Sequence, residues 1–114
     1  MPFTTAAENA AITGVKDLGS YISLHTADPG GSGSSEVSGG TYTREQTTWG
    51  SVAGSAVTGS AITADIPAGT TITHWGLWTA LSGGTFLYGG TLPASETFGS
   101  NGTYSLTPTL SASD

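Results

Sequence analysis

Short β-prone runs alternate with clusters of glycine and proline along the chain, and this punctuation restricts its fold more than any other feature. Three clusters stand out, at Asp28-Pro29-Gly30, Pro67-Ala68-Gly69 and Ser82-Gly83-Gly84. Because proline cannot donate to a strand ladder and glycine tolerates positive φ, such clusters predict turns. About six or seven short strands at regular spacing predict a mainly β protein, a small antiparallel β-sandwich of jelly-roll or Ig-like size.

The strands are expected from the period-two alternation of large side chains. The run 70–80 is the longest and most β-prone, and it places Trp75 and Leu77 on one face and His74 and Trp78 on the other. A strand with large groups on both faces belongs in the centre of a sandwich or at a subunit interface. The link 82–84 predicts a hairpin. The other expected strands are 21–26, 42–49, 61–66, 85–90 and 103–112, with a soft strand or loop at 51–60 and loops at 30–40 and 93–101.

A short helix is expected before the strands, over residues 6–18. Thr5 and Glu8 have the spacing of a capping box, in which each side chain satisfies a free backbone donor. Gly19 is a plausible C-cap. Gly14 lies inside the run and weakens the helix by about 1 kcal/mol relative to alanine, so packing rather than intrinsic propensity must hold the helix.

The expected helix carries one narrow apolar stripe. Ala11, Ile12, Val15 and Leu18 recur at three- and four-residue spacing. A marginal helix of this kind gains little on its own, and a neighbouring subunit is one source of the missing packing. The sequence therefore predicts two parts, an N-terminal helical segment or tether over residues 1–19 and a β-sandwich domain over residues 20–114.

Charged residues are scarce, at 9% of the chain against roughly 25% in an ordinary soluble domain. Serine, threonine and glycine take their place, which predicts a nearly neutral, hydroxyl-rich surface. Burying a hydroxyl that finds a partner costs far less than burying an ion, so such a surface favours assembly. The 36% hydrophobic residues, spaced at strand periodicity, argue against a disordered low-complexity chain.

Several function classes are disfavoured by composition. The net charge is −6, and Lys16 and Arg44 are the only two basic residues, which argues against nucleic-acid binding. Without cysteine, neither a disulfide framework nor a thiolate metal site can form. The chain has no apolar run of about 18 residues and no signal-peptide pattern. We therefore expect no membrane partner, and synthesis in the cytoplasm.

Catalytic, cofactor and metal sites are not expected. His25 and His74 are the only histidines, each lies in an alternating run, and no nucleophile, zinc or paired-carboxylate motif surrounds them. We interpret both as structural histidines. Asp28 and Glu36 could offer oxygen ligands to Ca²⁺, but their spacing matches no known loop. A turn hydrogen bond from Asp28 to its own backbone is the preferred interpretation.

Five residues are candidates for contacts with partners: Ile12, Val15, Leu18, Arg44 and Trp49. As a rare cation, Arg44 forms either a local salt bridge to Glu45 or Glu36 or an intersubunit fork, and we favour the intersubunit fork. Trp49, before Gly50, is the best candidate for an exposed aromatic residue.

Sugar binding is an alternative role for the aromatic residues of the central run. Trp75 and Trp78, with Phe86 and Tyr88, could stack on sugar rings. Because the two tryptophans point to opposite faces, at most one of them can belong to a given platform, and core packing is the preferred interpretation.

The order of four sequence blocks resembles a known family. The blocks are SLHTADPG, EVSGGTYTREQTTW, PAGTTITHWGLWTALSGGTFLYGG and ASETFGSNGTYSLTPTLSAS, and they extend from about Asn9 to Ser111. They are similar to small virion proteins of actinobacterial phages, known variously as minor capsid, head-decoration or tail-fibre proteins. The resemblance implies a non-enzymatic virion structural protein that is displayed as an oligomer, with trimers or pentamers matching the axes of the shell.

Among the phage roles, we favour a capsid decoration or cementing protein on the head. It would contact copies of itself and the major capsid protein or another virion protein, with the segment 1–19 as tether. Fibre proteins would be expected to carry further shaft segments. The alternative is a tail or tail-fibre component that binds host surface glycans. A glycan-degrading domain is the remote alternative, because paired acids are missing.

Overall fold

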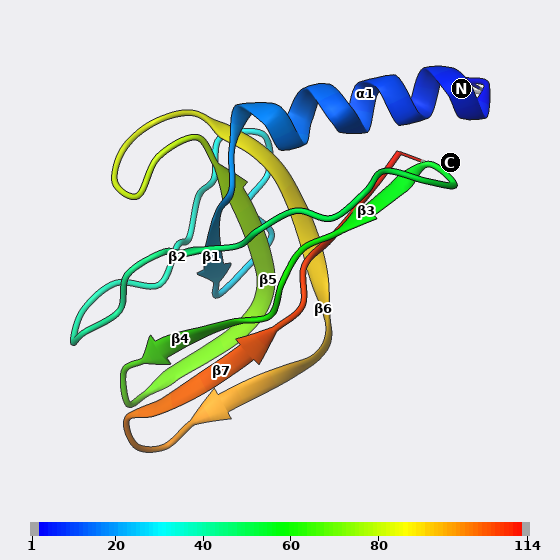
Figure 1. The fold of residues 1–114 in the computed structure, drawn as a ribbon. Coiled ribbons are helices and arrows are strands. Elements are labelled where there is room, and N and C mark those ends of the chain that lie inside the picture. Colours follow the sequence, from blue (N-terminus) through cyan, green and yellow to red (C-terminus); the bar gives the residue numbers. More distant parts are fainter. Residues whose placement is uncertain (1–2, 113–114) are drawn as a thin grey trace.

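The computed structural model describes residues 3–112 and shows a mainly β protein with one helix at its N-terminal end (Figure 1). All strand pairs are antiparallel. The predicted fold class, mainly antiparallel β with a short N-terminal helix, is confirmed. The elements are α1 (Thr5–Leu18), β1 (Tyr21–His25), β2 (Glu45–Gln46), β3 (Ala56–Thr58), β4 (Ile62–Ile66), β5 (Thr70–Trp78), β6 (Phe86–Phe98), β7 (Gly102–Leu106) and β8 (Thr109–Ser111).

Helix α1 begins one residue earlier than predicted, and its cap differs from the predicted capping box. Thr4 is the N-cap, and its hydroxyl accepts a hydrogen bond from the amide of Ala7 at 3.1 Å. The Glu8 side chain does not return to the cap, because it accepts a hydrogen bond from the Ser55 hydroxyl instead. Gly19 stands at the C-cap with extended backbone, φ −159°, so the helix ends there without a left-handed residue.

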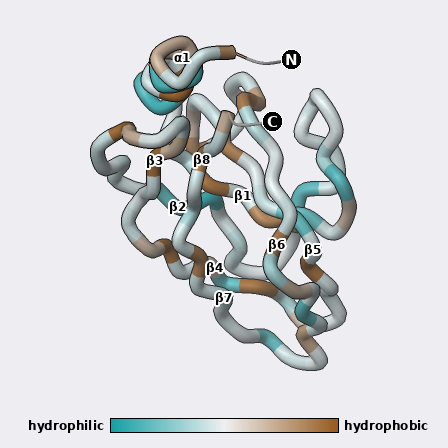
Figure 2. Tube along the Cα trace, turned by 90° about the vertical axis from the view of Figure 1, so that its right-hand side faces the viewer, coloured by the Kyte–Doolittle hydropathy of each residue, from teal (hydrophilic) through white to brown (hydrophobic). Residues whose placement is uncertain are grey.

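One side of α1 packs on the end of the β structure. Ile12 is 4% exposed and belongs to the hydrophobic core, and Val15 packs partly against it. Asn9 accepts a hydrogen bond from the backbone amide of Ser55, just before β3. Helix α1 and strand β3 therefore lie side by side (Figures 1 and 2). The division into a segment 1–19 and a domain 20–114 stays a prediction.

The largest sheet has four strands in the order β2-β1-β5-β6. Strand β1 is buried on both faces, from Ile22 to His25, since β1 lies between two strands and beneath loops. In β5, Ile72 and Leu77 are completely buried, and Trp75 and Trp78 are less than a tenth exposed. The prediction that this run has large buried groups on both faces is confirmed.

Strand β6 is much longer than predicted, because the expected loop at 93–101 is mostly strand. Thr91 pairs with His74 and Glu96 pairs with Ile72, so the four residues 92–95 lie opposite a single residue of β5. Pro93 lies in this bulge. A proline is tolerated in a strand where the ladder is already interrupted, which is why β6 continues past it instead of ending.

A second layer covers part of the large sheet. The β4–β7 pair crosses the ends of β5 and β6 that are remote from α1 (Figure 1), and apolar residues are distributed along the whole length of the fold (Figure 2). Ile62, Ala64 and Ile66 point inward, as the alternation predicted. Pro108 divides the expected last strand into β7, which pairs with β4, and β8, which pairs with β3.

The expected strand 42–49 is reduced to the two residues of β2. Thr47 donates its hydroxyl hydrogen to the backbone oxygen of Ser60, and Trp49 forms an isolated bridge with Gly59. The side chains of Tyr42 and Arg44 bond to Glu36. This segment is therefore held by contacts to several different neighbours, which replace a continuous ladder.

Replacing Leu77 with alanine tests the central position of β5. Leu77 is completely buried, so Leu77→Ala should lower the free energy of unfolding by about 2–5 kcal/mol in urea denaturation. Leu81→Ala is the matched control, because Leu81 is 54% exposed and exposed substitutions usually change stability by less than about 0.5 kcal/mol. Equal stability of the two variants would contradict this description of the core.

Candidate functional site

A largely buried ion pair lies within the loop between β1 and β2. Arg44 donates from Nε to one Glu36 carboxylate oxygen at 3.0 Å and from Nη2 to the other at 2.9 Å. The Arg44 and Glu36 side chains are 9% and 22% exposed. Two parallel bonds of this kind fix both position and orientation. The structure thus shows a local salt bridge for Arg44, with Glu36 rather than Glu45 as its partner, and a role for Arg44 in contacts between subunits stays a prediction.

The same guanidinium holds the loop between β5 and β6. Its Nη1 donates to the backbone oxygens of Ala80 at 3.0 Å and Gly83 at 2.8 Å. It also lies over the ring of Trp78, 3.7 Å from the centroid, in a cation–π arrangement. Since four hydrogen bonds and one ring contact converge on it, this side chain connects the loop 36–44 to residues 78–83, two segments that are far apart in the sequence.

Tyr42 completes the surroundings of the carboxylate. Its hydroxyl donates to Glu36 Oε2 at 2.8 Å and accepts from the backbone amide of Leu24 at 3.1 Å. Burial raises the pKa of Tyr42 above its usual value, and the neighbouring Glu36 charge raises it further. The phenol therefore remains a neutral donor to the carboxylate.

Beneath Trp78, a chain of hydrogen bonds crosses from β5 to β1. The indole Nε1 donates to Ser23 Oγ at 2.9 Å, and Ser23 Oγ lies 2.7 Å from His25 Nε2. His25 Nδ1 lies 2.8 Å from the carbonyl oxygen of Ser34. A carbonyl can only accept, so Nδ1 carries the proton, and Nε2 of the neutral ring accepts from the Ser23 hydroxyl. Burial lowers the pKa of His25, which favours this neutral form.

A serine beside a histidine is the arrangement of a nucleophile and its base. Here Ser23 and His25 are both completely buried, and every polar atom of the pair is used within the core. His25 is therefore the structural histidine that the sequence predicted. His74, half-buried, has Nδ1 2.7 Å from the hydroxyl of its neighbour Thr73.

Two glycines make room for this cluster. A Cβ at Gly76 would lie 2.6 Å from Ser23 Oγ and 2.8 Å from His25 Nε2. A Cβ at Gly33, where φ is +78°, would lie 2.4 Å from the Trp78 ring. Larger residues at either position would push the rings apart. Gly76 lies in the alternating run 70–80, and the need for glycine there became visible only in the fold.

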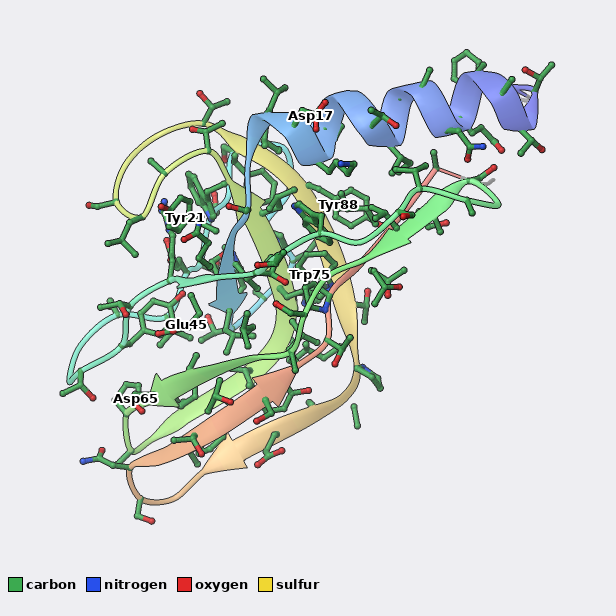
Figure 3. All side chains as sticks on the ribbon, in the orientation of Figure 1. Asp17, Tyr21, Glu45, Asp65, Trp75 and Tyr88 are labelled. Carbon is green, nitrogen blue, oxygen red and sulfur yellow. The ribbon has the colours of Figure 1, made fainter. Side chains whose placement is uncertain are left out.

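The aromatic residues considered for sugar stacking pack inside the protein. Trp75 is 5% exposed, and its ring centroid lies 5.4 Å from that of Tyr88 (Figure 3). Trp78 packs edge-on against Phe86. Trp49, expected to be exposed, is half-buried, and its Nε1 donates to the backbone oxygen of Gly19 at 2.9 Å. The preferred interpretation, core packing, is confirmed for Trp75 and Trp78.

The remaining candidate residues are not brought together. Ile12 is buried, Val15 is partly buried and Leu18 is 63% exposed, so the helical stripe divides between core and surface. Asp28 accepts a hydrogen bond from the amide of Gly30 at 2.9 Å, which is the predicted turn bond. Within residues 3–112, no group of three or more metal-ligating side chains is placed to hold an ion.

A surface depression of about 410 Å³ opens beside the ion pair. Its walls come from the loop 36–44 and from the loop that joins β5 to β6, where Leu81 is 54% exposed. Of the residues at this site, the sequence pattern indicated Arg44 but not Tyr42, Leu81 or Ser82. Ordinary loop residues carry no pattern that would reveal such a site.

Comparison with known proteins identifies the class. The chain is a phage virion structural protein: residues 5–110 match the sequence model of a family described as podophage GP4 fiber I protein gp80. Because the match spans most of the 114 residues, the chain belongs to this family. No curated protein matches the chain. The expected phage virion origin is confirmed, whereas the resemblance to proteins of actinobacterial phages stays a prediction.

Removing both partners of the ion pair should destabilise the protein by less than the two single removals added together. Arg44→Met and Glu36→Gln each leave buried polar groups unpaired and should each lower the free energy of unfolding by about 3 kcal/mol. The double variant should cost clearly less than the sum of the two. Arg44→Lys keeps the charge but loses the fork, so it should also destabilise. Urea denaturation measures the free energy of unfolding of all four variants. A double variant whose loss of stability equals the sum of the two single losses would contradict an energetic coupling between Arg44 and Glu36.

Stability should fall on mild acidification because of His25. Its pKa is lowered in the folded state from 6.5 by burial, so the unfolded chain binds the proton more tightly. The contribution of the neutral His25 ring to the free energy of unfolding is therefore fully present above pH 6.5. It is lost as the pH falls from there toward the lowered pKa. Urea midpoints between about pH 7.5 and pH 5 should show this slope. His25→Gln should flatten the slope and the control His74→Gln should keep it; an unchanged slope in His25→Gln would be the contrary result.

Proposed function

We propose that this chain is a structural subunit of a virion fibre that assembles with copies of itself and with another virion protein, and that it performs no catalysis. The observation that carries the proposal is the match of residues 5–110 to a fibre protein family, a range that contains nearly every described helix and strand. A head-decoration role, favoured from sequence alone, has no comparable support.

Self-assembly is supported by the chemistry of the surface. Exposed hydroxyls pair across all three sheets, at Thr71 with Thr97, at Thr63 with Ser105 and at Thr58 with Thr109. Such groups exchange water for a partner subunit at low cost. Strand β6 is the outermost strand of the large sheet, with β5 on one side only, and an open strand edge is a template for pairing.

The absence of catalysis is supported by the burial of the Ser23–His25 pair, since no substrate could reach either side chain without opening the core. Within the described chain, no helix has the length and apolar character to cross a bilayer.

Immunogold electron microscopy of intact phage particles tests the proposal. Antibodies raised against the purified chain should label fibres, and the same antibodies on particles of an unrelated phage give the background. Label confined to the head shell would refute the fibre role and restore head decoration.

Sedimentation equilibrium of the purified chain tests self-assembly. The measured mass should be that of an oligomer, and a monomer mass at every concentration would contradict self-assembly.

A further inference from the structure

The depression beside the ion pair has the properties of a built site. Its lining residues include Glu36 and Tyr42, which are partly exposed, and Leu81, Ser38 and Ser82, which are exposed. Its volume, about 410 Å³, falls within the usual range for small-molecule sites. Both walls are loops, which commonly carry binding residues.

The two walls are fixed relative to each other. Arg44 donates to Glu36 on one loop and to the backbone oxygens of Ala80 and Gly83 on the other. Val37, between the wall residues, is buried in the core, and its amide donates to the backbone oxygen of Leu24. The depression therefore exists before a ligand arrives, which reduces the entropic cost of binding.

The charge of the site selects against ionic ligands. The Arg44 guanidinium has four hydrogen bonds to acceptors of its own chain and is 9% exposed, so it offers little to an anion. The Glu36 carboxylate is neutralised by the guanidinium, so it attracts an amine only weakly. The net charge of −6 further disfavours anions.

The hydrogen-bonding groups and the apolar surface of the depression suit a neutral, hydroxyl-rich ligand. Carboxylate oxygens accept about two hydrogen bonds each, and Glu36 Oε1 has one from Arg44. Leu81 and the Tyr42 ring give apolar surface for the C–H face of a sugar, while Ser38 and Ser82 add hydroxyls. We propose that this depression binds one neutral saccharide unit of a surface polysaccharide. The inference rests on the proposed fibre role for bringing the site to a cell surface.

Binding of a single unit should be weak, because the depression is small and open to solvent. A dissociation constant in the millimolar range is expected for one site, and an oligomer that presents several copies would gain avidity toward a polymer.

Titrations of the full ¹⁵N-labelled chain test the proposal. The probes are the methyl glycosides of glucose, galactose, mannose and N-acetylglucosamine, with glucuronate and lysine amide as charged comparisons. At least one glycoside should shift the amide signals of residues 36–44 and 79–85 in a saturable way. No saturable shift with any glycoside, shifts confined to other residues, or stronger binding of a charged probe would overturn it.

A blocking variant provides the matched test. Ser82→Trp fills the depression from an exposed position and should abolish the shifts. Ser95→Trp is the control, since Ser95 is also exposed but lies in β6, at the edge of the large sheet opposite β2, and it should bind as the parent does. Equal urea midpoints would show that both variants are folded, and unchanged binding by Ser82→Trp would refute the site. Immunogold labelling decides the fibre role separately, because it does not depend on sugar binding.

Discussion

The fork between Arg44 and Glu36 is the interaction on which the rest of this end of the molecule depends. A guanidinium that is 9% exposed must find partners for its donors, because an unpaired buried charge costs several kcal/mol. It finds them in one carboxylate and two backbone oxygens and lies on the Trp78 ring. In a chain with so few charges, one such residue can define how loops distant in sequence are placed.

The network below the fork extends this constraint into the sheet. Trp78, Ser23 and His25 form a line of hydrogen bonds between β5 and β1, and Gly76 leaves the space that they occupy. Every buried side-chain polar atom of the described residues has a partner. A fully bonded polar core of this kind favours one arrangement over others, so the loops above it are supported by the continuous pairing of β1 with β5.

These features suit a virion component. Membership of the fibre protein family is shown by the sequence match, and the fold supplies an open strand edge, paired surface hydroxyls and a fixed depression. None of them depends on exposed ion pairs. Contacts built from hydroxyls and apolar area respond weakly to ionic strength, which is an advantage for a particle that passes between environments.

By itself, the sequence determined the class of fold, the helix, the turn at Asp28 and the buried faces of β4 and β5, because periodicity and turn chemistry are local properties. It also indicated a phage virion protein through the order of its blocks. Only the tertiary structure decided that β6 continues through Pro93 by a bulge, that Trp49 is half-buried, and that Arg44 turns inward to Glu36. These outcomes depend on which segments meet across the fold, and residue spacing along the chain does not contain that information.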